Sequence, residues 1–216
     1  MSEAVQEKMT RESPVVRRES PLHYVIDTEV SPGESKDTKG CAVVLREVQA
    51  KGYLTLRGNS NEASFTDGVL AALGVSLPTQ PGTCLKSDDI SIYWLSPDEW
   101  MLTTPGGTEA ELQARLRENL SGHFSVVDVS GGQTSINLSG DEVHGVLKKS
   151  SAYDFDELVF GVGRCTQTTF AKATALVSKR ADGSFDLIIR RSFADYIFSW
   201  IADAAGEYGF KALREI

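Results

Sequence analysis

Apolar and polar residues alternate along several short stretches of the chain, which is the pattern of half-buried strands. One apolar, β-branched stretch covers residues 124–129, and a Ser-Gly-Gly turn at 130–132 separates it from a second alternating stretch at 134–138. Two adjacent glycines favour a turn with positive φ angles. Ser139, with Glu142 three residues later, matches a helix-capping box. This region therefore predicts strand, tight turn, strand and helix.

The remaining elements repeat a similar order in both halves of the chain. In the first half the apolar spacing predicts strands and helices in the order 41–48, 53–58, helix 65–73, 90–94, 100–104 and helix 112–120. In the second half we expect a strand over 168–178, a turn at 181–183, a strand over 185–190 and a helix over 193–201.

Each half therefore has the order strand, helix, strand, hairpin partner, helix, which is a split β-α-β motif. We predict an α+β fold of two ferredoxin-like repeats, about 21–122 and 123–213, within one domain over 21–216. Neither half, at about 90 residues, is expected to be stable alone, so the two should pack as one unit.

The first 20 residues are rich in Glu, Lys, Arg and Ser. Such a segment buries too little apolar surface to offset its ordering entropy, so we expect residues 1–20 to form a flexible arm. The alternative is an arm that becomes ordered against a partner, because Val15, Val16 and Leu22 give it something to bury.

Charge narrows the range of partners. The chain of 216 residues has 22 Lys and Arg against 30 Asp and Glu, a net charge of −8. An acidic chain repels phosphate backbones, which argues against a nucleic-acid partner. No apolar run approaches the roughly 20 residues of a membrane helix, and residues 2–20 have no apolar signal-peptide core. We expect a cytoplasmic protein with no membrane partner.

Cysteines and histidines lie far apart in the sequence, without the spacing of metal ligands: Cys41, Cys84 and Cys165, and His23, His123 and His144. No metal site and no disulfide framework are predicted. We expect buried, inert thiols rather than reactive ones, since free cysteine behaves as a small apolar residue.

Several motifs together resemble a known family, the gamma subunit of heterotetrameric sarcosine oxidase. The resemblance covers roughly residues 21–213, and its motifs are Ser96–Leu102, Asp128–Gly131, Leu138–Gly140, Gly163–Thr168 and Arg191–Tyr196. The family is in turn similar to the folate-binding domain of the glycine-cleavage aminomethyltransferases. Those proteins have Asp-Val-Ser-His-Met where this chain has Asp128-Val129-Ser130-Gly131-Gly132.

The resemblance implies a folate-binding scaffold that is retained without its ligand, and no cofactor on this chain. It implies FAD and FMN on a beta subunit, NAD and tetrahydrofolate on an alpha subunit, and zinc on a delta subunit. The alpha subunit is the expected direct contact.

The aminomethyltransferase comparison suggests Asp128 as a general base. The structural interpretation is a strand-end aspartate that accepts hydrogen bonds from the turn amides, and we favour it because no histidine or second carboxylate lies nearby in sequence. Related folate-fold proteins have a Gly-Cys-x-x-Gly-Gln run, so Cys165 with Gln167 suggests a nucleophile. No base is identifiable, and we favour a packing role on one strand face.

Other motifs have similar alternatives. The Gly131-Gly132 and Gly161–Gly163 turns match neither phosphate-loop pattern, so turn geometry is favoured. Trp100 and Trp200 are candidates for interface anchors or for core residues. Arg190 and Arg191 are candidates for pairing with acidic partner groups or for solvated surface charges.

We predict no catalytic, cofactor-binding or metal-binding residue on this chain. It would act as a structural subunit of a sarcosine oxidase complex. One alternative is the small subunit of a related N-methylglutamate-type dehydrogenase. The other is a free-standing folate-binding protein of the aminomethyltransferase type.

Overall fold

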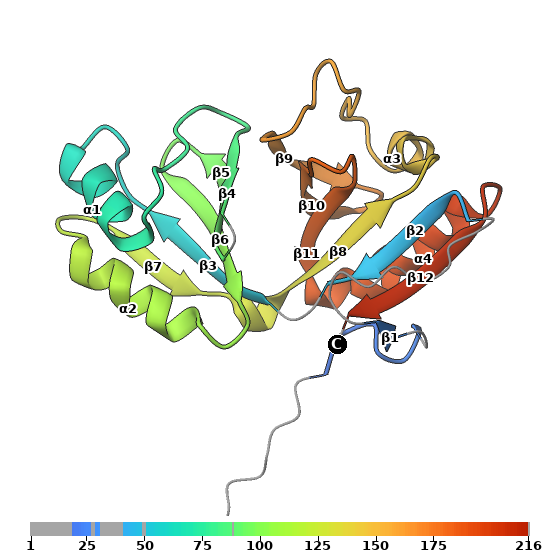
Figure 1. The fold of residues 1–216 in the computed structure, drawn as a ribbon, viewed down its shortest axis with the longest axis horizontal. Helices are drawn as coiled ribbons and strands as arrows, with labels where there is room; N and C mark the ends of the chain where they lie inside the picture. The colour runs from blue at the N-terminus through green and yellow to red at the C-terminus, as the bar shows by residue number, and fades with distance from the viewer. Residues whose placement is uncertain (1–18, 27–28, 31–40, 49–50, 88, 216) are drawn as a thin grey trace, which may run out of the picture.

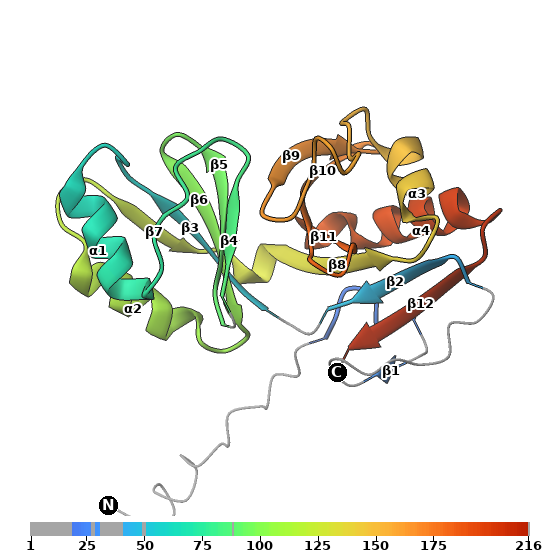
Figure 2. The same cartoon turned by 45° about the horizontal axis from the view of Figure 1, so that its top comes forward.

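The structure, a computed structural model, describes residues 19–26, 29–30, 41–48, 51–87 and 89–215. It contains two β-sheets, and Figures 1 and 2 show α1 and α2 on the outer side of the first sheet and α3 and α4 against one side of the second. Most of the predicted N-terminal arm, residues 1–18, lies outside the described residues.

The first sheet has five strands, and all neighbouring strands are antiparallel. Their order across the sheet is β4 (Cys84–Lys86), β5 (Ser91–Ser96), β6 (Glu99–Pro105), β3 (Lys51–Arg57) and β7 (Ser125–Asp128). Two helices belong to this sheet, α1 (Ala63–Leu73) and α2 (Glu109–Asn119).

The second sheet has seven strands and is mixed, since β12 pairs in parallel with both β1 and β2. The order is β1 (Glu29–Val30), β12 (Phe210–Glu215), β2 (Val43–Glu47), β8 (Gln133–Ser139), β11 (Phe185–Arg190), β10 (Ala173–Lys179) and β9 (Cys165–Phe170). Its helices are α3 (Val143–Ser150) and α4 (Ala194–Ala205).

Both sheets contain a ferredoxin-like unit, so the predicted α+β fold of two such repeats is confirmed. The first is β3-α1-β5-β6-α2-β7, and the second is β8-α3-β10-β11-α4-β12. The sheets, however, do not follow the predicted division near residue 122. Strand β2, from the first half of the sequence, is inserted between β12 and β8, and β7, from the second half, forms an edge of the first sheet.

The predicted single strand over 168–178 is wrong, because β9 and β10 form a hairpin there. Ala171 in the turn has a φ of 54°, a conformation that a residue other than glycine adopts uncommonly. The backbone nitrogen of Ala171 donates to the Ser150 carbonyl at 2.6 Å, which ties this turn to the end of α3. Apolar and polar residues go on alternating through the turn, so the sequence pattern does not show where one strand ends and the next begins.

Two details at the junction of β7 and β8 also differ from prediction. Residues Ser130–Gly132 form a 3₁₀ turn (η2), and neither Gly131 nor Gly132 has a positive φ, because 3₁₀ backbone keeps φ negative. The predicted cap at Ser139 does not form: α3 begins at Val143, and its N-cap residue, Glu142, makes no side-chain capping bond.

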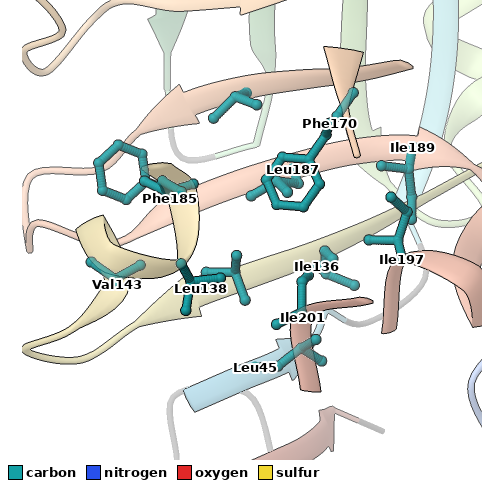
Figure 3. Packing of buried hydrophobic residues seen from close by; sticks show 14 of the residues in the cluster. Leu45, Ile136, Leu138, Val143, Phe170, Phe185, Leu187, Ile189, Ile197 and Ile201 are labelled. Carbon is teal, nitrogen blue, oxygen red and sulfur yellow. The ribbon is translucent and has the colours of Figure 1, made fainter. Parts of the chain in front are cut away.

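Alternation along each strand divides the buried apolar residues between three large clusters and a fourth, small one formed by Val44 and Leu213. Leu54 of β3 packs beneath α1 and α2, while its neighbour Tyr53 points to the opposite face. In β11, Leu187 and Ile189 pack against α3 and α4, while Ile188 points away from them. Figure 3 shows the second-sheet core, where side chains of β2, β8, β11 and α4 converge.

The sheet faces that carry no helices contact each other. Their shared cluster contains residues of both sheets: Tyr53, Cys84, Tyr93 and Met101 from the first, and Cys165, Leu176 and Ile188 from the second. A hydrogen bond of 2.7 Å between Tyr53 Oη and Ser135 Oγ crosses the same interface. The halves therefore pack as one body, as their small separate cores require.

The insertion of β2 into the second sheet gives a direct test. Replacing Leu45, which is fully buried in the second-sheet core, by Ala should lower the free energy of unfolding by about 2–5 kcal/mol. Hydrogen exchange should accelerate most in β8 and β12, the two neighbours of β2.

The matched control is Leu54→Ala, because Leu54 is equally buried in the first-sheet core. This variant should accelerate exchange most in β6 and β7. Faster exchange of β6 and β7 in Leu45→Ala would contradict the observed strand order.

Candidate functional site

The main buried polar group between the sheets is the carboxylate of Asp186, which is 8% exposed. Arg180 Nε donates to both of its oxygens at 2.8 Å, and Lys86 Nζ lies 3.0 Å from Oδ2. Asn137 Nδ2 donates to Oδ1 at 2.9 Å. Lys86 comes from the first sheet and the other residues from the second, so these polar contacts join the two repeats.

Strand register produces this arrangement. Asp186 alternates with Phe185 and Leu187 in β11, and its Cα partner in β8 is Asn137. The sequence analysis did not identify this group. The available signal was one acidic residue inside the otherwise apolar run Phe185–Ile189.

Electrostatics assign this cluster a structural role. Burial raises the pKa of Asp186, but the charges of Lys86 and Arg180 and the bond from Asn137 outweigh burial, and the pKa lies below its usual value. Burial also lowers the pKa of Lys51, near Asp186. The carboxylate is thus ionised and its oxygens are occupied by protein donors, which leaves it unsuited to proton transfer.

The thiols of Cys84 and Cys165, 4% and 1% exposed, lie in the shared cluster between the sheets. A hydrogen bond between the two sulfurs, together with burial, raises the pKa of Cys165, and the same bond lowers that of Cys84. Cys165 Sγ also donates to the Thr83 carbonyl at 3.2 Å. Gln167, the other residue of the proposed motif, is exposed on β9. The packing position predicted for Cys165 agrees with this geometry.

Asp128 occupies the position that the structural interpretation predicted, at the end of β7. Its Oδ1 accepts hydrogen bonds from the backbone nitrogen of Ser130, at 2.9 Å, and from the Ser130 hydroxyl. A Cβ at Gly131 or Gly132 would meet nothing within 4 Å. The turn therefore has open space, and no side chain, at these two positions.

The second glycine-rich turn does not have phosphate-loop geometry either. The carbonyl of Gly163 accepts a hydrogen bond of 2.8 Å from the Cys84 nitrogen, and the Gly161 carbonyl accepts from Arg164 at 3.2 Å. A phosphate cradle needs converging N–H donors. Here the Gly161 carbonyl closes its own turn, and the Gly163 carbonyl joins the start of β9 to β4, beside the isolated bridge between Thr83 and Arg164.

Of the two tryptophans considered as interface anchors, Trp100 is a core residue. It is fully buried, and its Nε1 donates to the Pro78 carbonyl at 2.7 Å. Trp200 is half-buried on α4 and donates to Ser150 Oγ at 3.1 Å. Arg190 and Arg191 are exposed, and Arg191 donates to the Glu19 carbonyl. Arg191 thus holds the start of the described N-terminal segment.

Metal-binding groups of three or more His, Cys, Asp or Glu side chains are absent from the described part of the chain. His23 and His144 have other contacts: His23 Nδ1 lies 2.6 Å from the Ser20 carbonyl, and the His144 ring packs edge-on against Phe185. No helix among the described residues is long and apolar enough to cross a membrane.

Comparison of structures defines the class of fold. The aminomethyltransferase T of the glycine cleavage system from Bartonella henselae superposes with a TM-score of 0.62 at 12% identity, over 80% of this chain and 48% of that chain. The two paired ferredoxin-like units thus have the same fold as about half of that aminomethyltransferase chain.

Sequence comparison identifies the family. The family described as "Sarcosine oxidase, gamma subunit family" matches residues 57–207. The sarcosine oxidase gamma subunit of Corynebacterium sp. (strain P-1) is 30% identical over 200 residues, covering 91% of this chain and 94% of that protein. The chain belongs to the sarcosine oxidase gamma subunit family.

A solved structure of this family has the same architecture. A chain of the heterotetrameric sarcosine oxidase from Corynebacterium sp. U-96, determined in complex with pyrrole 2-carboxylate, superposes with a TM-score of 0.76 at 28% identity. The match covers 88% of this chain and 96% of that chain. The family resemblance inferred from the motifs is confirmed.

The Asp186 cluster should make stability depend on pH. Because the pKa of Asp186 is depressed in the folded state, its contribution is present above the unfolded value of about 3.9 and is lost as pH falls through the folded value. Asp186→Asn should lower the free energy of unfolding near pH 7 by about 3 kcal/mol, since it leaves Arg180 and Lys86 without their carboxylate.

Urea unfolding at several pH values measures this effect, and the gap between wild type and variant should close below about pH 4. The control is Asp98→Asn, because Asp98 pairs with Arg57 at the exposed surface. It should lower stability much less than Asp186→Asn does, because its partners are exposed. A pH-independent gap for Asp186→Asn would contradict the assignment.

The burial of the cysteines predicts selective thiol labelling. In the folded protein an alkylating reagent should modify Cys41, which is partly exposed, and should reach Cys84 and Cys165 only after unfolding. Mass spectrometry of timed samples, with a denatured sample as control, measures this order. Labelling of Cys165 as fast as that of Cys41 would refute the inert role.

Proposed function

We propose that this chain is a non-catalytic structural subunit of a heterotetrameric sarcosine oxidase. The complex would oxidise sarcosine with oxygen, releasing glycine and hydrogen peroxide and passing the methyl carbon, at the formaldehyde level, to tetrahydrofolate. The observation that carries the proposal is the superposition on nearly the whole length of a chain from such a heterotetramer.

The chemistry of the chain's own residues supports a structural role. Two carboxylates, those of Asp128 and Asp186, are candidates for a general base, and both accept hydrogen bonds from neighbouring protein groups. The buried thiols are free: Cys84 Sγ donates to the Arg164 carbonyl and Cys165 Sγ to the Thr83 carbonyl. An enzyme acting alone needs positioned groups whose pKa values match the reaction, and these groups serve the packing of the two sheets.

Cofactors belong to other subunits in this proposal. FAD and FMN would lie on a beta subunit, NAD and tetrahydrofolate on an alpha subunit, and zinc on a delta subunit, with the alpha subunit in direct contact with this chain. The assembly would be cytoplasmic. We expect no nucleic-acid or membrane partner, because the net charge of −8 repels phosphate-bearing surfaces.

Co-expression of the four subunits tests the proposal. A tag on the alpha subunit should retain this chain in a fixed ratio, and the complex should produce peroxide when sarcosine is added. The chain alone should show no turnover and should self-associate, because a surface built for permanent contact exposes apolar groups when free.

Four outcomes would count against this function. Turnover by the chain alone, or folate binding that Asp128→Ala abolishes, would favour the aminomethyltransferase-type alternative. Oxidation of N-methylglutamate by the complex in preference to sarcosine would favour the dehydrogenase alternative. A monomeric and highly stable free chain would count against a permanent subunit.

A further inference from the structure

An apolar surface tip lies between α3 and β9, at residues Leu158–Val162. Leu158 is 97% exposed, Val159 54% and Val162 64%, and Leu158 has the highest exposed fraction among the large apolar side chains of the described residues. Single exposed apolar residues are common on protein surfaces. Three of the eight exposed large apolar side chains of the described residues lie within these five positions, and a concentration of exposed apolar groups is typical of contact sites.

Hydrogen bonds from backbone nitrogens to aspartate side chains and to a backbone carbonyl order the tip. Asp156 Oδ1 accepts a hydrogen bond from the Leu158 nitrogen at 3.0 Å. The Asp156 carbonyl accepts from Val159 at 3.0 Å and from Phe160 at 2.7 Å. In the preceding turn, Asp154 Oδ1 accepts from the Asp156 nitrogen at 3.0 Å. Aspartates that bond to nitrogens two residues later form successive tight turns.

Buried aromatic residues anchor the tip on both sides. Phe155 and Phe160 are 3% and 0% exposed, and their rings meet edge-to-face with centroids 5.2 Å apart. Both also pack against Phe185 of β11. Glu157 forms an ion pair of 2.7 Å with Lys179, whose side chain is 4% exposed. Leu158, Val159 and Val162 therefore lie exposed on a segment that the buried rings of Phe155 and Phe160 anchor to the core.

Preorganisation of this kind favours association. A binding loop that is already ordered loses little conformational entropy when a partner covers it, so more of the gain from apolar burial appears as affinity. Leu158 and Val159 point to solvent on a turn whose neighbours are fixed in the second-sheet core. The tip is therefore an ordered, exposed apolar segment that could insert into a pocket of a partner protein.

Charge around the tip indicates the chemistry of the partner. Asp154 and Asp156 are exposed beside the apolar residues, while the Glu157 carboxylate is paired with Lys179. The segment from Ser150 to Gly163 contains no Lys or Arg. A complementary surface would be an apolar pocket with a basic rim. A second copy of this chain is disfavoured, because a two-fold contact through the tip would bring two acidic rims together.

We propose that the tip at Leu158–Val162 docks into an apolar, basic-rimmed pocket on another subunit of the oxidase. The inference rests on the proposed function and adds the surface through which the chain joins the assembly. Leu158 and Val159 supply the apolar contact, and the charge of Asp154 attracts the basic rim of the partner's pocket.

Retention of this chain in the four-subunit complex tests the proposal. With the tag on the alpha subunit, the double variant Leu158→Ser with Val159→Ser should weaken retention after dilution by about tenfold or more. The matched control is Leu70→Ser, because Leu70 is 45% exposed on α1, on the other repeat. It should be retained like wild type. Asp154→Asn keeps the turn acceptor and should reduce the salt dependence of assembly.

Crosslinking supplies a second measurement that does not depend on binding strength. A photoreactive maleimide on Leu158→Cys should crosslink to another subunit in the assembled complex, above the background from Cys41 in wild type. The same group on Leu70→Cys should not.

The outcomes separate this proposal from the proposed function. Failure of wild type to be retained at all would overturn both. If wild type and the double variant are retained to the same extent, and position 158 gives no crosslink, the docking proposal for the tip is wrong while the proposed function stands. A crosslink from position 158 to another copy of this chain would also overturn it.

Discussion

The fold depends on burying both faces of each sheet. A sheet with helices on one side and water on the other could keep polar residues at every second position, but here the alternate positions carry apolar residues such as Tyr53, Met101 and Ile188. These residues are buried only because the two helix-free faces contact each other. The pairing of the repeats is therefore a requirement of the sequence, and it explains why the Asp186 cluster between them must be satisfied by groups of both sheets.

The sequence predicted the local structure better than the pairing of distant strands. Alternation located β5, β6 and β11, and the resemblance identified the family, because both signals lie in neighbouring residues. Nothing local indicates that β2 and β3 lie in different sheets, or that β7 and β8 do so on either side of the predicted turn. The hairpin at Ala171 was hidden because alternation continues across it. The contact between Lys86 and Asp186 could not be predicted from local sequence, because these residues are 100 positions apart.

This arrangement links the scaffold to its proposed role. Where the aminomethyltransferases carry a His-Met pair, the chain has a bare Gly-Gly turn, and its polar groups at the joint are bonded to one another. The elements that remain available to other molecules lie on the surface, and the ordered apolar tip after α3 is the clearest of them. In the proposed role, contact with other subunits is the contribution of this chain.

The most direct measurement of this account is a cryo-electron microscopy map of the assembled oxidase at a resolution that shows side chains. The account predicts continuous protein density between the two sheets of this chain, with Lys86 and Arg180 on Asp186, and no pterin or flavin within it. Density for a pterin or flavin between those sheets, bounded by Asp128 or Asp186, would contradict the account.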